Sequence, residues 1–325
     1  MKAIVTRRFG SPAQMGVEER PTPVRKPGQA LVRMRAATIS PYTATVRSGA
    51  FGPEYATVPL VLGSEGAGVV EEGERFAPGT RVAVYGGGEL GTTADGMFQQ
   101  WVAVDEDRLL VLPDTLDFAE GSALTVNYLT AYLALTDIAH VTPDRTVLVS
   151  GASGSVGHAS IQTASALGAR PIALVSSPEK ARWAEQAGAW AVIDRSAGNL
   201  GDAVANVTDG QGADLALDPV GGPLLGTLLH VLRRGGTLVS LGFVGGMRAE
   251  VDVMDLIGGE KYVTGYSLFS HSTEAIAPAL RGIGELAAAG RLRPVIDSRI
   301  PLNDFENGYT RLASRQAVGS VVVEL

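Results

Sequence analysis

The stretch Thr146–Gly157, TVLVSGASGSVG, decides the fold of this chain. Its first five residues are an apolar run that predicts a buried strand, and the seven that follow contain three glycines. Residues Val156–Leu167 then have the spacing of a helix. Strand, glycine-rich turn and helix in this order favour dinucleotide binding over a plain glycine turn without a ligand. Glycine lets the backbone approach a pyrophosphate, and the helix N-terminus presents N–H groups and a partial positive charge.

Beyond this stretch, strand and helix patterns alternate along the chain, which predicts an α/β protein with a parallel, doubly wound sheet. The expected strands are Pro171–Ser176, Ala191–Ile193, Asp214–Asp218, Thr237–Leu241 and Tyr262–Tyr266. The expected helices are Pro178–Ala187, Leu224–Leu232 and Glu274–Ala289. An apolar segment with helical spacing, Phe118–Tyr132, precedes the alternating region.

The first third of the chain and its tail have a different character, with short strands separated by Gly and Pro turns. The expected strands are Lys2–Thr6, Ala30–Ala37, Val69–Glu72, Arg81–Tyr85, Gln100–Val104, Val295–Ile300 and Ser320–Leu325, with a helix at Phe305–Leu312. Many short strands of this kind predict a small barrel.

Composition excludes several classes of function. The 325 residues, 45% of them hydrophobic, suffice for about two domains. The net charge of −7 argues against a nucleic-acid partner. With no cysteine, the chain can form no disulfide, thiol nucleophile or Cys-ligated metal site. It has no secretory apolar segment and no run of roughly 18 apolar residues, so we expect a cytoplasmic protein that is not inserted in a membrane.

The residues after the second strand of the alternating region bear on the choice of dinucleotide. An NAD site usually has an acid there for the ribose 2′-hydroxyl, whereas this chain has Ser176 and Ser177. Lys180 follows within one helical turn, and Arg195 lies at the end of the third strand. Hydroxyls and cations suit a 2′-phosphate. We therefore expect NADPH, although each cation by itself could be ordinary solvated surface.

The chain resembles the medium-chain dehydrogenase/reductase superfamily, and most closely its zinc-free quinone oxidoreductases. The resemblance is carried by segments spread over nearly the whole chain: Pro59–Val70 (PLVLGSEGAGVV), Asn127–Leu135, Val147–Asp194, Asp218–Gly221, Leu241–Phe243 and Ala288–Asp297. It implies a GroES-like β-barrel domain made from residues 1–122 and 291–325. A Rossmann NADPH-binding domain at 123–290 would lie between these segments, and the nicotinamide would lie in a cleft between the domains.

The resemblance also implies roles for individual residues around the cofactor. Thr130 would lie near the nicotinamide-side ribose or the phosphates, and Ser153, Gly154, Ser155 and Val156 would hold the pyrophosphate. Ser176, Lys180 and Arg195 would surround the 2′-phosphate. Val220, Phe243 and Val244 would line the path of the cofactor, and the backbone at Ser267, Leu268 and Phe269 would meet the carboxamide. For the apolar members, plain core packing is an equal alternative.

Zinc-dependent relatives need a cysteine near Ser40 and a histidine near Ser64, and neither is present. A catalytic zinc needs three protein ligands, and the four histidines are far apart in the sequence. We therefore expect no metal. Without one, the easiest chemistry is hydride transfer to an acceptor that stabilises its own anion, such as a quinone or an α,β-unsaturated carbonyl.

The first active-site loop, Ser40–Phe51, departs from the quinone reductase pattern. Ser40 and Thr43 stand where Asn and Asp are usual, and Thr45 and Phe51 where tyrosines are usual. Tyr42 is the phenol left to donate to a developing oxyanion, and Asn127 is a second polar candidate. For Tyr42 the alternative is a wall residue, and for Asn127 a structural hydrogen bond.

Three functions remain open: reduction of quinones or activated enones, reduction of enoyl-CoA or enoyl-acyl-carrier thioesters, and non-catalytic NADPH binding. A homodimer is expected by analogy with the family and because Tyr262–Tyr266 would lie at the sheet edge.

Overall fold

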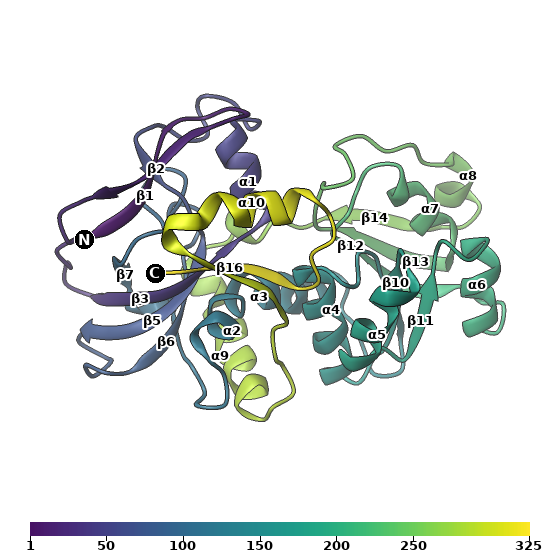
Figure 1. The fold of residues 1–325 in the computed structure, drawn as a ribbon. Helices are drawn as coiled ribbons and strands as arrows, with labels where there is room; N and C mark the ends of the chain where they lie inside the picture. The colour runs from purple at the N-terminus through teal and green to yellow at the C-terminus, as the bar shows by residue number, and fades with distance from the viewer. The chain divides into compact units, whose positions relative to one another are not determined.

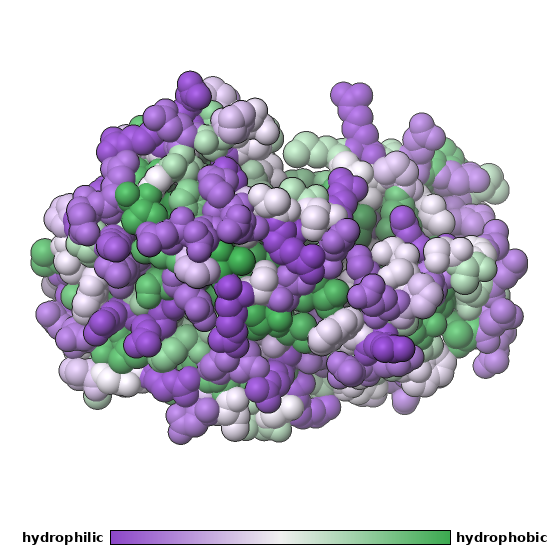
Figure 2. Space-filling model, viewed as in Figure 1, coloured by the Kyte–Doolittle hydropathy of each residue, from purple (hydrophilic) through white to green (hydrophobic).

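The computed structural model describes all 325 residues, which form two compact units (Figure 1). The β unit comprises Met1–Val126 and Phe269–Leu325, and the α/β unit comprises Asn127–Leu268. No helix in the structure is both long enough and apolar enough to cross a membrane. In the view of Figure 2, hydrophilic residues cover most of the visible surface and apolar residues lie in small groups among them.

The β unit is built from strands at both ends of the chain. A seven-stranded sheet has the order β15-β16-β3-β5-β6-β8, with β7 paired to β3, and a three-stranded sheet has the order β2-β1-β4. The long central strand β3 pairs antiparallel with β5, β7 and the C-terminal β16. The bounds are β1 Lys2–Arg8, β2 Gln14–Glu19, β3 Gln29–Ile39, β4 Leu60–Val61, β5 Glu65–Glu72, β6 Arg81–Tyr85, β7 Trp101–Asp105, β8 Leu109–Val111, β15 Ile296–Pro301 and β16 Ser320–Glu324.

Alternation along β3 explains where the core of this unit lies. Val32, Met34 and Ala36 are buried, whereas Arg33 and Arg35 between them are exposed, because successive side chains of a strand point to opposite faces. Val32 and Met34 pack with residues of β1, β6 and the segment before β7, and Ala36 packs with Ala119 and Val322. The pattern that predicted the strand therefore also identified its inward face.

The α/β unit has a six-stranded, fully parallel sheet with the order β11-β10-β9-β12-β13-β14. The strands are β9 Thr146–Val149, β10 Arg170–Val175, β11 Ala191–Asp194, β12 Ala213–Asp218, β13 Leu232–Ser240 and β14 Tyr262–Gly265, and the larger helices are α4 Ser155–Ala166, α5 Pro178–Gln186, α6 Leu200–Val207 and α7 Leu224–His230. This confirms the doubly wound prediction. The strand order reverses between β9 and β12, and ligands of such sheets bind outside the carboxyl ends of the strands at this point.

Helix α9 (Thr273–Ala288) differs from expectation, since the sequence assigned it to the nucleotide domain. It lies in the β unit, against β8 and the short helix η1 (Glu106–Arg108). Gly284 allows this close packing, because a Cβ there would lie 2.6 Å from Leu110 Cδ1. Arg108 Nε also donates to Thr273 Oγ1 at 3.2 Å. The nucleotide unit therefore ends at Leu268 rather than at residue 290.

The apolar segment expected at Phe118–Tyr132 is divided into two helices. The first, α2, spans Phe118–Ser122 and is capped by Asp117, and the second, α3, spans Thr125–Leu133. Pattern reading also missed β2, α6 and the short helix α8 (Val253–Ile257).

Candidate functional site

The glycine-rich turn joins the fully buried strand β9 to helix α4, as predicted. Gly151 has a φ of +54°, which favours glycine. A Cβ at Gly157 would lie 2.2 Å from the Gly151 carbonyl oxygen, so only glycine lets the helix approach the turn this closely. Gly154 is the N-cap of α4 and has no side chain to accept from the first turn. The N–H groups of that turn are thus suited to a phosphate oxygen, and Ser153, Ser155 and Val156 lie beside them.

Two further loops lie at the same carboxyl edge of the sheet. Val220, which follows β12, packs so closely that a Cβ at Gly151 would be 2.9 Å from its Cγ2. The Gly245 N–H donates to the Val220 carbonyl at 2.7 Å, joining the loop after β13 to the loop after β12. Phe243 is half-buried on this loop, and Val244 is 48% exposed. The structure therefore brings Val220, Phe243 and Val244 to the edge where the sequence placed the cofactor.

Asp218, at the end of β12, lies beside the candidate site, and sequence reasoning gave it no role. It is fully buried, and its Oδ1 accepts from Ser150 Oγ at 2.6 Å and from the N–H groups of Val220 and Gly221 at 3.0 and 3.1 Å. Its Oδ2 has no hydrogen-bond partner. One carboxylate thus ties the end of β9, just before the glycine turn, to the loop after β12. The DPVG motif was visible in the sequence, but the contact with Ser150 was not.

The residues predicted to surround a 2′-phosphate lie after neighbouring strands. Ser176 is exposed after β10, and Lys180 Nζ lies 3.5 Å from its Oγ. The Arg195 N–H donates to the Val175 carbonyl at 3.1 Å, so Arg195 begins beside the end of β10. Asp194 is the nearby acid that the sequence reading passed over. Its Oδ1 accepts from both the N–H and the Oγ of Ser196, at 2.9 and 2.7 Å.

Asn127 and Thr130 lie three residues apart on α3, and both are buried. Glu65 holds the start of this helix: its Oε2 accepts from Thr125 Oγ1 and from the Val126 N–H, at 3.2 and 2.8 Å. Glu65 follows the position near which zinc-dependent relatives have a histidine, and here it serves as a helix cap.

The segment Ser40–Phe51, expected as a loop, is largely the helix α1 (Pro41–Ser48). Ser40 and Thr43 form a capping box, Pro41 starts the first turn and Gly49 ends the helix with a φ of +75°. Ser40, at the cysteine position of zinc-dependent relatives, therefore caps a helix. The structure contains no group of three or more His, Cys, Asp or Glu side chains placed to hold a metal ion.

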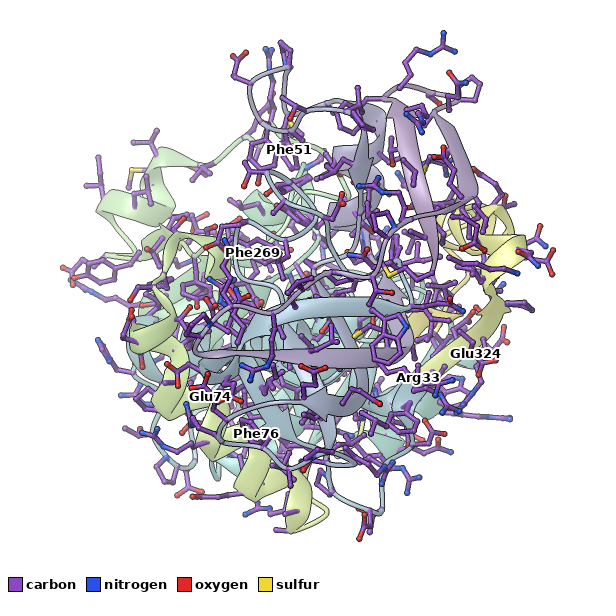
Figure 3. All side chains as sticks on the ribbon, turned by 90° about the vertical axis from the view of Figure 1, so that its left-hand side faces the viewer. Arg33, Phe51, Glu74, Phe76, Phe269 and Glu324 are labelled. Atoms are coloured by element: carbon purple, nitrogen blue, oxygen red, sulfur yellow. The ribbon has the colours of Figure 1, made fainter.

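Tyr42 lies in an aromatic cluster that consists of Tyr42, Phe51, Tyr55, Tyr85 and Phe269. Its ring centroid is 4.6 Å from that of Phe269 and 5.9 Å from that of Phe51, and Figure 3 labels both phenylalanines. Its hydroxyl lies 2.8 Å from the Tyr55 hydroxyl, so Tyr42 is not the only phenol here. Burial, and then the hydrogen bond with Tyr55, raise the pKa of Tyr42 well above its usual value. This raised pKa favours the neutral phenol of Tyr42 over the phenolate.

The segment predicted to meet the carboxamide spans the division between the two units. Ser267 is exposed and Leu268 is buried at the end of the α/β unit, and Phe269 begins the second part of the β unit. The Phe269 ring also stacks on Tyr85, with centroids 6.4 Å apart and planes 2° from parallel. Its side chain therefore belongs to the aromatic cluster, a role that the sequence did not suggest.

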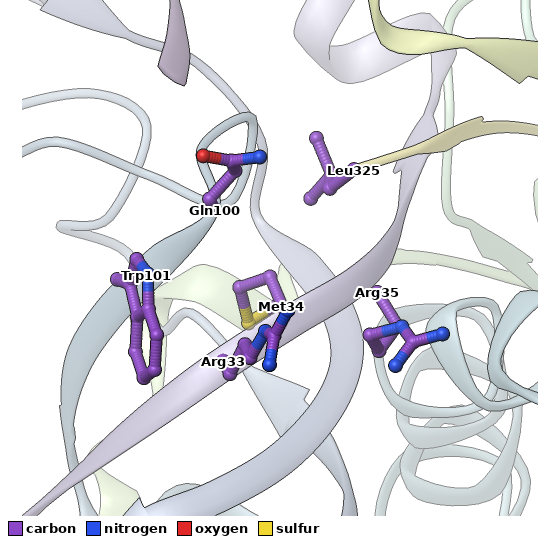
Figure 4. Close-up of a pocket in the computed structure, with 6 residues that line it drawn as sticks. All are labelled: Arg33, Met34, Arg35, Gln100, Trp101 and Leu325. Atoms are coloured by element: carbon purple, nitrogen blue, oxygen red, sulfur yellow. The ribbon is translucent and has the colours of Figure 1, made fainter. Parts of the chain in front are cut away.

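A pocket of about 300 Å³ on the β unit is separate from all of these residues. It is lined by Arg33, Met34, Arg35, Gln100, Trp101 and Leu325 (Figure 4). Arg33 and Arg35 are on the exposed face of β3, and Arg33 lies 5.9 Å from the centroid of the Trp101 ring. None of the predicted site residues lines it.

Comparison with known proteins supports two domains of these kinds. Residues 26–114 match the family model described as alcohol dehydrogenase GroES-like domain, and residues 155–283 match the one described as zinc-binding dehydrogenase. These matches confirm the expected pairing of a GroES-like domain with a Rossmann-like domain.

Individual relatives cover the whole chain. It is 34% identical to a quinone oxidoreductase of Pseudomonas aeruginosa over 332 aligned positions, which cover 99% of each chain. A solved structure of Escherichia coli quinone oxidoreductase complexed with NADPH has a TM-score of 0.88 to this chain and 27% sequence identity. A solved structure of an NAD-dependent alcohol dehydrogenase has a TM-score of 0.90 and 29% sequence identity. Each match covers 100% of both chains. Since the Escherichia coli protein was solved with NADPH and the alcohol dehydrogenase is described as NAD-dependent, the choice for this chain must be argued from its own residues.

Proposed function

Because the chain belongs to the medium-chain dehydrogenase/reductase superfamily and is quinone oxidoreductase-like, we propose that it is an NADPH-dependent reductase that transfers hydride to a quinone or an activated α,β-unsaturated carbonyl without zinc. Bound NADPH would supply the hydride, and the protein would supply position and electrostatics. The observation that carries this proposal is the Ser176–Lys180 pair after β10, where NAD-binding relatives have an acid.

The residues fit a dinucleotide, because the glycines let the turn at Gly151–Gly157 pack closely on the start of α4, whose first-turn N–H groups suit a phosphate. In this proposal Ser153, Gly154, Ser155 and Val156 hold the pyrophosphate through backbone N–H groups, and Ser176, Lys180 and Arg195 hold the 2′-phosphate. Thr130 lies near the ribose, and Val220, Phe243 and Val244 lie along the cofactor. Ser267 to Phe269 meet the carboxamide through their backbone. The two catalytic candidates are Tyr42, which donates to the oxyanion, and Asn127.

Replacement of Lys180 tests the cofactor. NADPH should bind to the unaltered protein at least about tenfold more tightly than NADH, a difference of about 1.4 kcal/mol. Lys180→Ala should weaken NADPH and leave NADH nearly unchanged, because only NADPH carries the phosphate. Fluorescence titration of both cofactors measures this, and Arg182→Ala, on the same helix, controls for the loss of one charge. Equal affinities of the unaltered protein for NADPH and NADH would rule out the proposal.

Turnover with a panel of acceptors tests the reaction. Small ortho- or para-quinones should oxidise NADPH measurably, since the reduced quinone anion is resonance-stabilised and can be protonated by water. Simple aldehydes and unactivated alkenes should react little. A chelator should leave the rate unchanged, and purified protein should contain substoichiometric zinc. Fast reduction of an enoyl thioester with no quinone activity would overturn the proposed class of acceptor. If none of the acceptors in the panel is reduced, non-catalytic NADPH binding would be favoured instead.

We also propose that two copies pair along the outer edge of β14, which has only β13 as a neighbour. Tyr262 and Val263 on this strand are 64% and 43% exposed, and Val253, Met254 and Ile257 of α8 are more than half exposed. An open strand edge with exposed apolar side chains favours pairing with a second copy. Light scattering at micromolar concentration should show a dimer that Val263→Lys weakens, whereas Val24→Lys, at an exposed valine of the β unit, should not. A monomeric unaltered protein would refute this.

A further inference from the structure

The hydroxyl pair formed by Tyr42 and Tyr55 has no counterpart in the sequence pattern that suggested a quinone reductase. Their oxygens are 2.8 Å apart, and either can be the donor. Tyr42 is half-buried, whereas Tyr55 is 37% exposed, so the pair runs from the interior of the aromatic cluster towards solvent. Phe51 contacts both rings, with centroids 5.9 Å from Tyr42 and 4.6 Å from Tyr55.

Local backbone structure explains how two tyrosines thirteen residues apart meet. Tyr42 is held in the first turn of α1 by the Ser40 capping box. Gly49 and Gly52, with φ values of +75° and +95°, then reverse the chain. The Gly52 N–H donates to the Gly49 carbonyl at 3.1 Å, and the Tyr55 N–H donates to the Gly52 carbonyl at 3.3 Å. The meeting of the two phenols is thus a product of this turn.

The direction of the hydrogen bond decides what Tyr42 can do. A hydroxyl has one hydrogen to donate. If Tyr55 donates to Tyr42, the Tyr42 hydrogen is left for a substrate oxygen, and the two bonds in series strengthen each other. Because burial raises the pKa of Tyr42 and disfavours its phenolate, transfer of its proton is favoured when another proton replaces it in the same step. Tyr55 is the neighbouring group that can supply that proton and recover one from water.

We propose that Tyr55 is a positioning residue that donates to Tyr42 Oη, so that Tyr42 Oη–H points to the oxygen on which negative charge forms. This inference rests on the proposed reductase function. Hydride addition to a quinone gives a hydroquinone monoanion; Tyr42 gives its proton to that oxygen, Tyr55 gives its proton to Tyr42, and water reprotonates Tyr55. The net reaction consumes one hydride and one solvent proton per quinone.

Binding of 4-nitrophenolate, a stable aryl oxyanion, tests the pair without any turnover. The probe is titrated into the protein at pH 8 to 9 and followed by its absorbance shift. Tyr42→Phe should raise the Kd for 4-nitrophenolate by about 10- to 100-fold, as expected for loss of a hydrogen bond to a charged group. Tyr55→Phe should raise it by roughly 3- to 10-fold. The double variant should bind no more weakly than Tyr42→Phe alone, because Tyr55 acts through Tyr42.

Tyr85→Phe is the matched control, since it removes from the same cluster a buried hydroxyl that has no hydrogen-bond partner. Its Kd should change by less than about twofold. An unchanged Kd in Tyr55→Phe, additive losses in the double variant, or an equal loss in Tyr85→Phe would each overturn the assignment.

A proton inventory in mixtures of H₂O and D₂O provides a second readout in the presence of NADPH and a quinone. Two protons in flight should give a curved dependence of kcat on the deuterium fraction, and Tyr55→Phe should make it linear. A linear dependence in the unaltered protein would exclude the relay. Absence of quinone turnover would instead defeat the proposed function, and the nitrophenolate titration would still decide the role of Tyr55.

Discussion

Gly157→Ala is expected to lower kcat/KM for NADPH by roughly 10²-fold or more, because a shift of about 1 Å in a binding loop can cost that much. The added Cβ would lie 2.2 Å from the Gly151 carbonyl oxygen and 2.9 Å from Ala152 Cα. These are backbone atoms, so the turn or the start of α4 must move. Steady-state kinetics and a fluorescence titration of NADPH measure the loss.

The same substitution separates a clash from a change in helix propensity. Alanine in place of a helical glycine should by itself stabilise α4 by up to about 1 kcal/mol. A variant that melts near the original temperature but binds NADPH poorly would therefore locate the damage in the turn. Gly198→Ala controls for a new methyl group in the same unit, because its Cβ would meet nothing within 4 Å. Unchanged NADPH affinity in Gly157→Ala would contradict the role of the turn.

The parts of this fold that could be predicted are those that local sequence determines. The strand, turn and helix around Gly151–Gly157 lie within about twenty residues, and each is defined by its own apolar spacing or by glycine. The parallel, doubly wound character of the sheet followed from the alternation of strand and helix patterns. Even so, the helix at Pro41–Ser48 was missed although Ser40, Pro41 and Gly49 are its start and stop signals. The resemblance to quinone reductases implies a loop here, whereas the capping residues predict the helix that the structure has.

The features that could not be predicted depend on contacts between distant residues. The spacing of α9 indicates a buried face but does not say which unit covers it. In the structure α9 packs against β8, where Gly284 lies close to Leu110. Tyr55 has no motif, and it reaches Tyr42 only through the turn at Gly49 and Gly52. Ser150 and Asp218 are 68 residues apart, so their hydrogen bond is fixed by the pairing of β9 with β12.

Asp218→Ala should lower the free energy of unfolding of the α/β unit by about 3–5 kcal/mol, the scale of breaking a buried charged network. The carboxylate accepts from three donors, Ser150 Oγ and the N–H groups of Val220 and Gly221. Alanine would leave all three without a partner, two of them buried and the Val220 N–H partly buried, at about 1–3 kcal/mol for each buried donor if nothing relaxed. Calorimetry should show the transition of this unit about 10 °C lower.

Asp218→Asn distinguishes the hydrogen bonds from the charge. Asparagine keeps an oxygen that can accept from the same three donors, and its amide nitrogen would occupy the place of Oδ2, which has no partner. The loss should therefore be smaller, about 1–2 kcal/mol, since only the charge assistance of the bonds is removed. Asp202→Ala, at an exposed position on α6, should have little effect on the same transition. Equal losses in the alanine and asparagine variants would mean that the charge matters more than the acceptor.

NADPH connects this stability effect to the site, because Asp218 joins the strand before the glycine turn to the loop after β12. If the loops of Asp218→Ala still close around the cofactor, NADPH at 10³ times its Kd should recover about 4 kcal/mol of stability, as it would in the unaltered protein. If the carboxylate is needed to hold the loops in place, the Kd itself should rise, and the same NADPH concentration should raise the melting temperature much less. If the variant is less stable but its Kd for NADPH is unchanged, Asp218 would have a structural role only and no role in cofactor binding.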